Sequence, residues 1–207
     1  MENEIILQAS QISIGYSHKK EKTIIASNID LSLRKGKLIA LIGANGIGKS
    51  TLLRTITGIQ KTISGTVLLN GINIHELDAL TLAQNLSVVL TEKLPPSNLT
   101  VFELIALGRQ PYTKWIGKLT DTDLTKVNEA MELTQISHLA TKKHFEISDG
   151  QLQKVLIARA LAQDTPLIIL DEPTTHLDLL HKFTLLQLLL KLAKETININ
   201  PTCGIAQ

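Results

Sequence analysis

The stretch GANGIGKS, residues 43–50, decides the fold, because it fits the phosphate-loop pattern G-x-x-x-x-G-K-[ST] at every position. The glycines let successive backbone N–H groups turn toward one anion, and a helix that starts there adds the positive end of its dipole. Lys49 is expected to reach the β- and γ-phosphates of a nucleotide, and the Ser50 hydroxyl to bind Mg²⁺. The alternative is a plain glycine turn between a strand and a helix. The predicted phosphate-binding residues are Gly43, Ala44, Asn45, Gly46, Ile47, Gly48, Lys49, Ser50 and Thr51.

The flanking sequence has the strand and the helix that such a loop requires. IDLSLRKGKLIALIG, residues 29–43, has β-type apolar patterning with Gly36 as a turn, and its second half ends at the glycine loop. KSTLLRTITGI, residues 49–59, has the apolar spacing of one helical face and Gly58 as a stop. Further strands are predicted in residues 5–16, 65–71 and 85–90.

The remainder of the chain predicts a single α/β domain with an inserted helical lobe. Residues from about 101 to 139 are predicted to be mostly helical, with a loop at residues 108–120. A helix over residues 151–162, a buried strand within residues 166–173 and an apolar helix over residues 179–195 follow. We therefore expect an α/β core at about 1–90 and 165–207, and a helical lobe at about 91–164.

LIILDE, residues 167–172, is an apolar strand that ends in two acidic residues. Taken alone, such a strand is more often one that simply meets solvent. Downstream of a phosphate loop, Asp171 is expected to hold Mg²⁺ and Glu172 to act as the base that polarises the attacking water.

ISDGQ, residues 147–151, starts the next helix, with Ser148 as its predicted N-cap and Gly150 permitting close approach. Its N-terminus is a second candidate anion site. On these five residues alone, an ordinary capped helix is the favoured interpretation.

Composition excludes several classes of protein. The 207 residues are 43% hydrophobic and 19% charged, as in a folded globular domain, and the net charge of +2 without a basic run gives no support to a nucleic-acid partner. A single cysteine, Cys203, excludes an internal disulfide and fits a reducing cytoplasm. Neither a signal peptide nor an apolar run of about 18 residues is present, so a partner chain would have to span any membrane.

The order of these motifs, a phosphate loop, a helical lobe, SDGQ, LDEP and then HLD, resembles that of the ATP-binding cassette ATPases over residues 5–195. The resemblance implies a P-loop core with an N-terminal β-subdomain and an inserted helical subdomain, and ATP with Mg²⁺ as ligands. It also implies a homodimer or a paired cassette subunit, in which the helix after Ser148, Gly150 and Gln151 caps the ATP of the partner. Asp178 matches the loop that couples the two sites. Tyr16 matches an aromatic residue that stacks on adenine; the alternative is an ordinary tyrosine at a strand end.

Residues 98–117, NLTVFELIALGRQPYTKWIG, resemble the cassette subgroup that powers uptake of iron–siderophore, haem and cobalamin chelates. This implies an integral membrane permease as partner, an indirect link to a substrate-binding protein, and a peripheral place on the cytoplasmic face of the cell membrane. A cassette protein of DNA repair or translation is disfavoured, because tandem cassettes, a coiled-coil insertion and a basic face are lacking.

Three features depart from the family. Asp149 replaces a glycine, which a helix's first turn tolerates. Thr91 or Glu92 stands where a glutamine contacts Mg²⁺, and the sequence does not decide between them; Thr91 is taken as the metal residue. No histidine follows His181, so the usual C-terminal histidine loop is expected to be lacking. The expected consequences are an unpaired edge in the core sheet, lower stability, and hydrolysis more impaired than ATP binding. A truncated, hydrolysis-impaired nucleotide-binding protein is therefore the alternative function.

Overall fold

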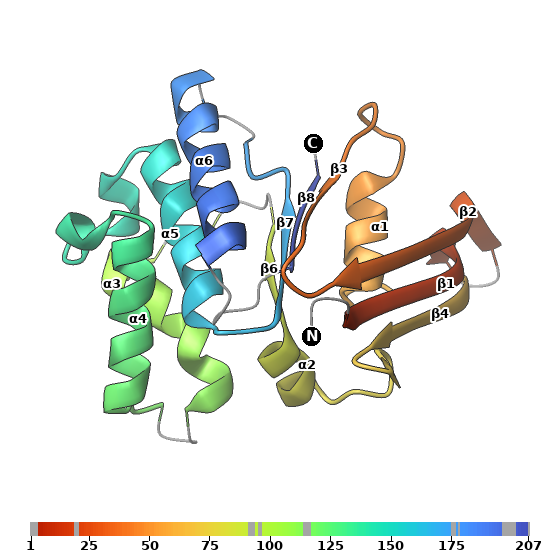
Figure 1. Ribbon diagram of the computed structural model, residues 1–207, viewed down its shortest axis with the longest axis horizontal. Coiled ribbons are helices and arrows are strands. Elements are labelled where there is room, and N and C mark those ends of the chain that lie inside the picture. The colour runs from red at the N-terminus through yellow and green to blue at the C-terminus, as the bar shows by residue number, and fades with distance from the viewer. Residues whose placement is uncertain are drawn as a thin grey trace.

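Two four-stranded sheets lie on either side of helix α1 in the computed structural model (Figure 1). The structure describes residues 4–18, 21–90, 94, 97–113, 117–174, 177, 179–195 and 202–206. Strands and helices alternate along much of the chain, and the predicted α/β class is confirmed.

The first sheet is antiparallel and has the order β2-β1-β4-β5. Its long strands β1 and β2 pair along most of their length, with several irregularities in the register between Ile5 and Gly15. Strand β4 pairs with the other edge of β1 but only as far as Ser13. Its strands are β1 (Ile5–His18), β2 (Glu21–Arg34), β4 (Ser64–Leu69) and β5 (Ile72–Asn73).

The second sheet is parallel, with the order β3-β8-β7-β6. Strand β7 is buried along its whole length, which explains its unbroken apolar sequence. The sheet consists of β3 (Leu38–Leu41), β6 (Leu86–Val89), β7 (Leu167–Asp171) and β8 (Thr202–Ala206). The expected unpaired edge is wrong, because β8 lies between β3 and β7 and pairs with both.

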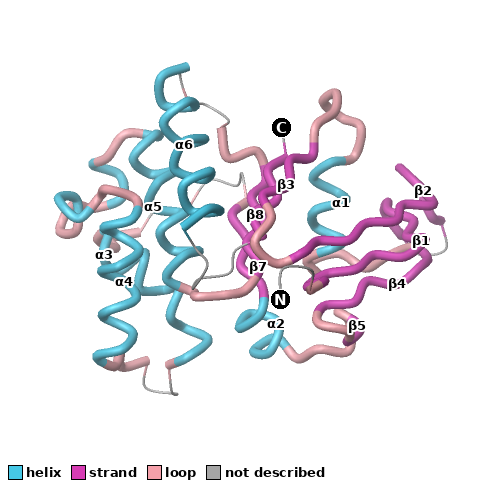
Figure 2. The backbone as a smooth tube through the Cα atoms, viewed as in Figure 1, coloured by secondary structure: helices cyan, strands magenta, loops and turns pink. Residues whose placement is uncertain are grey.

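Each face of the parallel sheet has its own hydrophobic cluster. Leu167 and Ile169 of β7 face a cluster shared with α1 and the antiparallel sheet. Ile168 and Leu170 face the opposite cluster, which contains residues of α3, α4, α5 and α6. Figure 2 shows the resulting division, with α1 on one side of the parallel sheet and the helices α3 to α6 on the other. The helices of the lobe therefore share one hydrophobic cluster with β7 of the parallel sheet.

Apart from α2, which was not predicted from the sequence, the helices follow the predicted segments with small shifts at their ends. The segment at Val101–Leu139 divides into helical pieces, and residues 107–112 form a 3₁₀ turn that covers the first part of the loop predicted at 108–120. α5 begins two residues earlier than predicted, and α6 has the predicted bounds. The helices are α1 (Lys49–Ile56), α2 (Ala79–Asn85), α3 (Val101–Ala106), α4 (Asp121–Leu133), α5 (Asp149–Ala162) and α6 (Leu179–Glu195), with 3₁₀ turns η1 (Leu107–Tyr112), η2 (Ser137–Leu139) and η3 (His144–Glu146).

Candidate nucleotide site

The glycine loop joins the end of β3 to the start of α1. Gly46 and Gly48 have φ angles of +79° and +104°, a left-handed conformation that glycine adopts without strain. Gly48 is also the N-cap of α1, and a Cβ there would lie 2.6 Å from Ile25 Cγ2 of β2. Because glycine has no side-chain oxygen to cap the helix, the first N–H groups of α1 are available to an anion.

Lys49 is buried and folds back over this loop. Its Nζ donates hydrogen bonds to Gly43 O at 2.9 Å and to Ala44 O at 3.1 Å. The ammonium therefore lies against the loop that is predicted to hold phosphates, and both of its acceptors are neutral carbonyls. A phosphate oxygen would be a stronger acceptor for this cation than either carbonyl.

Ser50 and Asp171 come from distant parts of the sequence and meet where α1 begins and β7 ends. Ser50 Oγ donates a hydrogen bond to Asp171 Oδ1 at 3.0 Å. The side chain of Asp171 is buried, and this burial raises its pKa above the ordinary value, with the neighbouring Glu172 also raising it and the Ser50 hydrogen bond opposing the shift. The nearby cations Arg54 and Lys49 oppose this shift as well, but the effect of burial is the larger one.

The hydroxyl of Ser50 and the carboxylate of Asp171 fit Mg²⁺, which prefers oxygen ligands and takes only one or two from protein in nucleotide sites. Within the described ranges, no group of three or more His, Cys, Asp or Glu residues could hold a metal ion by itself. A divalent cation here would complete its coordination with phosphate oxygens and water.

Glu172 follows Asp171 where the chain leaves β7, and it is partly exposed. Its φ angle of +46° is uncommon for a residue with a side chain. The left-handed turn ends the strand at this point, so that Asp171 is the last residue of β7 and Glu172 begins the loop.

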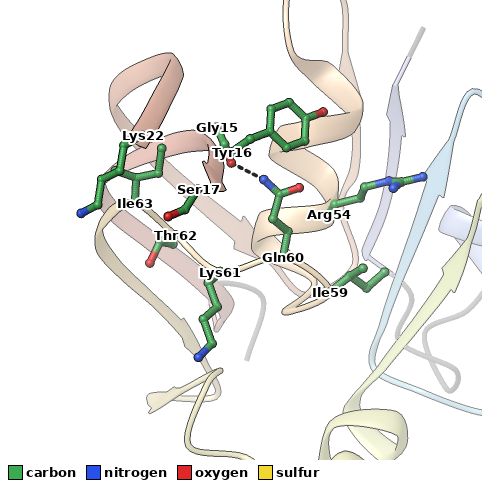
Figure 3. A pocket seen from close by; sticks show the side chains of 10 residues that line it. All are labelled: Gly15, Tyr16, Ser17, Lys22, Arg54, Ile59, Gln60, Lys61, Thr62 and Ile63. Carbon is green, nitrogen blue, oxygen red and sulfur yellow. Dashed lines mark hydrogen bonds between the residues drawn. The ribbon is translucent and has the colours of Figure 1, made fainter. Parts of the chain in front are cut away.

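Tyr16 lies near the end of β1, and its side chain is 57% exposed. Its hydroxyl lies 3.4 Å from Thr51 Oγ1, on the first turn of α1. A hollow of about 540 Å³ lies beside it, between the end of β1, Lys22 and residues 59–63 (Figure 3). The predicted stacking residue therefore lies within reach of the phosphate loop and is open to solvent.

The structure does not bring Ser148, Gly150 and Gln151 to the glycine loop. Ser148 is the N-cap of α5, its Oγ accepts from Gln151 N at 3.3 Å, and Gln151 Oε1 accepts from Ser148 N at 3.0 Å. This reciprocal capping matches the ordinary interpretation of the motif. Helix α5 packs on the opposite face of the parallel sheet from α1 (Figure 1).

Some predicted residues lie outside the part of the chain that the structure describes. These are Thr91, Glu92 and Asp178, together with the side chains of His181 and Cys203. Their assigned roles stay predictions.

Sequence reasoning missed the role of Arg109 in the ALGRQPY segment. The guanidinium is buried, and its Nε donates to Asp123 Oδ1 at 2.8 Å while Nη1 donates to Ala162 O at 2.8 Å. The guanidinium carbon also lies 4.0 Å from the centroid of the Tyr112 ring. Hydrogen bonds from Thr120, and then Arg109, lower the pKa of Asp123 to about 2. Arg109 thus joins η1 to α4 and α5, a role that only the tertiary structure reveals.

Comparison with known proteins places these features in context. Residues 26–175 match the ABC transporter family. An uncharacterised ABC transporter ATP-binding protein of Methanocaldococcus jannaschii is 44% identical over 92% of this chain and 64% of its own length. The iron(3+)-hydroxamate import ATP-binding protein of Bacillus subtilis is 41% identical, and the achromobactin transport ATP-binding protein of Dickeya dadantii 40% identical, each over 91% of this chain and 69% of the relative. The chain thus spans about two thirds of the length of these relatives.

A solved structure of an ATP-binding cassette has the same fold as this chain. A dimeric ATP-binding cassette in a post-hydrolysis state, bound to ADP and Pi, superposes with a TM-score of 0.79 and 27% identity over 97% of this chain and 88% of that one. No helix within the described residues is long and apolar enough to cross a membrane.

Proposed function

This chain belongs to the ABC transporter family, and we propose that it is the ATP-hydrolysing subunit of an importer for iron–siderophore or related metal chelates. The observation that carries the ATP-hydrolysing part of the proposal is the hydrogen bond of 3.0 Å between Ser50 and Asp171, beside a glycine loop whose lysine is folded inward. The importer part is supported by the similarity to the iron(3+)-hydroxamate and achromobactin transport ATP-binding proteins. These groups together provide a cation, a hydroxyl, a carboxylate and free helix N–H groups at one place.

Binding of ATP follows from the charges of these groups. The backbone amides of residues 43–51 would surround the β- and γ-phosphates, and Lys49 would exchange the carbonyls of Gly43 and Ala44 for phosphate oxygens. Ser50 and Asp171 would hold Mg²⁺, with Thr91 as a further proposed ligand residue. When bound, Mg²⁺ would neutralise charge on the phosphates. Tyr16 would stack on the adenine ring.

Hydrolysis needs an ordered water, and Glu172 is the proposed base that orients it and accepts its proton. The residues of the signature helix, Ser148, Gly150 and Gln151, would act on the ATP of a second copy or paired subunit. Their place on the far side of the sheet supports this arrangement, because α5 does not face its own glycine loop. Asp178 is proposed to couple the two sites.

A surface around η1, where the helical lobe meets α2 of the core, supports the proposal of a permease partner. Two hollows of about 600 and 480 Å³ flank η1 and share Leu107 and Gln110. Leu80 of α2 and Leu107 of η1 are exposed at the first of them. We propose that a cytoplasmic helix of the permease docks along this groove, while the transported chelate never touches the subunit.

ATP binding is tested first by calorimetry with Mg–ATP. The wild-type chain is expected to bind ATP, and Lys49→Ala to weaken the affinity at least about tenfold by removing a charge-assisted contact. Lys142→Ala changes an exposed lysine and serves as the control. Absence of ATP binding by the wild-type protein, or equal affinity of the Lys49→Ala variant, would contradict the proposal.

The importer role is tested by fractionating cells of the source organism. The chain is expected in the membrane fraction, and Leu107→Glu is expected to release it while ATP affinity is kept. Leu124→Glu, which changes an exposed leucine of α4 outside the groove, is the matched control. If Leu107→Glu stays with the membranes as the wild type does, the permease does not dock on this groove.

A further inference from the structure

Gln60 connects the phosphate-binding helix to the strand end that carries Tyr16 (Figure 3). We propose that Gln60 is a positioning residue for the nucleobase, because it fixes Tyr16 at a set place relative to the glycine loop. The inference rests on the proposed binding of ATP and adds a residue that no motif contains.

Within the described residues, no strand pairs with the end of β1 on the side of β4. Pairing with β4 stops at Ser13, whose carbonyl also accepts a hydrogen bond from Ile63 N at 2.9 Å. Beyond that point the Gln60 side chain takes the place of a strand, and its Nε2 donates to the carbonyl of Gly15. Since a carbonyl oxygen can only accept, the amide nitrogen of Gln60 must be the atom that faces it. Gly15 immediately precedes Tyr16, so this bond acts on the backbone that places the ring.

Gly15 itself has no room for a side chain, because its backbone packs closely against β2 and Ile63. A Cβ at this position would lie 1.9 Å from Thr23 O and 2.9 Å from Ile63 Cδ1. The backbone is therefore held by β2 on one side and by Gln60 on the other. Loss of the Gln60 bond would remove the backbone support of this end of β1 on the side opposite β2.

The other end of the connection lies on α1. The backbone N–H of Gln60 donates to Arg54 O at 2.9 Å, which ties the residue to the C-terminal turn of the helix. The N-terminal turn of the same helix begins the phosphate site, and there Thr51 Oγ1 lies 3.4 Å from the Tyr16 hydroxyl. The Gln60–Gly15 bond and the Tyr16–Thr51 contact thus together set the distance between the Tyr16 ring and the phosphate loop. Stacking on a base whose phosphates are already held requires such a fixed distance.

The test compares ATP with inorganic triphosphate, both with Mg²⁺, by calorimetry on the whole chain. Gln60→Met keeps the length of the side chain but cannot donate, and Gln60→Glu replaces the donor with an acceptor. Both are expected to weaken ATP binding about tenfold and to leave triphosphate binding within about twofold, because only the stacking contact is lost. Gln84→Met is the matched control, since Gln84 Nε2 also donates to a carbonyl, that of Pro111 at 3.0 Å, away from this site.

A double variant separates positioning from direct contact. Tyr16→Ala is expected to reduce the preference for ATP over triphosphate, and Gln60→Met added to Tyr16→Ala is expected to reduce it no further. An unchanged ATP-to-triphosphate ratio in Gln60→Met, or equal loss for both ligands, would overturn the inference while ATP binding by the wild type stands. Failure of the wild type to bind either ligand would instead overturn the proposed function.

Discussion

Removing the buried guanidinium of Arg109 is expected to destabilise the fold strongly. Arg109→Met keeps most of the apolar stem and deletes the partner of Asp123, whose side chain is 3% exposed. It also deletes the donor to Ala162 O and the contact with the Tyr112 ring. The variant therefore leaves one buried carboxylate without its cation and one buried carbonyl without its donor.

The size of the effect follows from what remains around Asp123. Breaking a buried ion pair costs about 3–5 kcal/mol. The lower end applies here, because the N–H and the hydroxyl of Thr120 still donate to the carboxylate and are the main cause of its low pKa. A loss of about 3 kcal/mol in a chain of this size corresponds to a fall in Tm on the order of 6–12 °C.

The assay is urea unfolding at pH 7, followed by circular dichroism. Lys126→Met, on the same helix as Asp123, removes a more exposed lysine that lies 3.2 Å from Asp164, and it is expected to cost less than about 1 kcal/mol. Adding Asp123→Asn to Arg109→Met is expected to recover part of the loss by removing the unpaired charge. An unfolding free energy for Arg109→Met equal to that of Lys126→Met would show that the buried Arg109–Asp123 pair does not stabilise the fold.

The pH dependence of the unfolding free energy is a second test of the Arg109–Asp123 pair. The folded pKa of Asp123 is depressed from 3.8 to about 2, so its stabilisation is present above the ordinary value and is lost as the pH falls between the two. Arg109→Met should raise this pKa. The unfolding free energy of the variant is therefore expected to fall less steeply than that of the wild type across this range.

Three further changes have defined outcomes. Asp171→Asn is expected to raise the Tm of the nucleotide-free protein at pH 7 by a few degrees. The pKa of Asp171 is raised in the folded state, so its ionised carboxylate destabilises the fold at pH values above that pKa, and this cost is absent at lower pH. The same variant is expected to lose the Mg²⁺ dependence of ATP binding. In the wild type, the affinity for Mg–ATP should fall as acid protonates Asp171. Calorimetric titrations at several pH values check both expectations. Gly108→Ala would place a Cβ 2.3 Å from Arg159 O and is expected to cost about 1–3 kcal/mol in urea unfolding, so an unchanged midpoint would contradict the packing of η1 on α5. Ser148→Ala removes the N-cap of α5 and is expected to cost about 1 kcal/mol, whereas Ser137→Ala, which removes no cap, should cost little.

Local motifs of the site were predictable because their chemistry depends on neighbours in sequence. The glycine loop, the helix after it and the strand ending at Asp171 each carry their own pattern, and the structure places Ser50 against Asp171 as the pair of motifs predicts. The capping role of Ser148 was likewise visible, because an N-cap acts within one helical turn.

Features that depend on distant partners could not be predicted in this way. Strand β8 is defined by its pairing with the parallel strands β3 and β7, because residues 202–206 carry little strand pattern of their own. The role of Gln60 depends on where β4 leaves β1, and that of Arg109 on three elements meeting at one point. A glutamine in a loop and an arginine beside a proline look like surface residues until these contacts are known.

Glu172 is proposed to act as the base in hydrolysis of ATP bound at the glycine loop. The most direct measurement is the steady-state release of phosphate from Mg–ATP by the wild type and by Glu172→Gln, with ATP affinity measured on the same samples. We predict that Glu172→Gln keeps its affinity within a few fold and loses turnover by about 10²–10⁴-fold, while Glu132→Gln on the exposed face of α4 behaves as the wild type. Equal turnover by Glu172→Gln and the wild type would show that Glu172 is not the base.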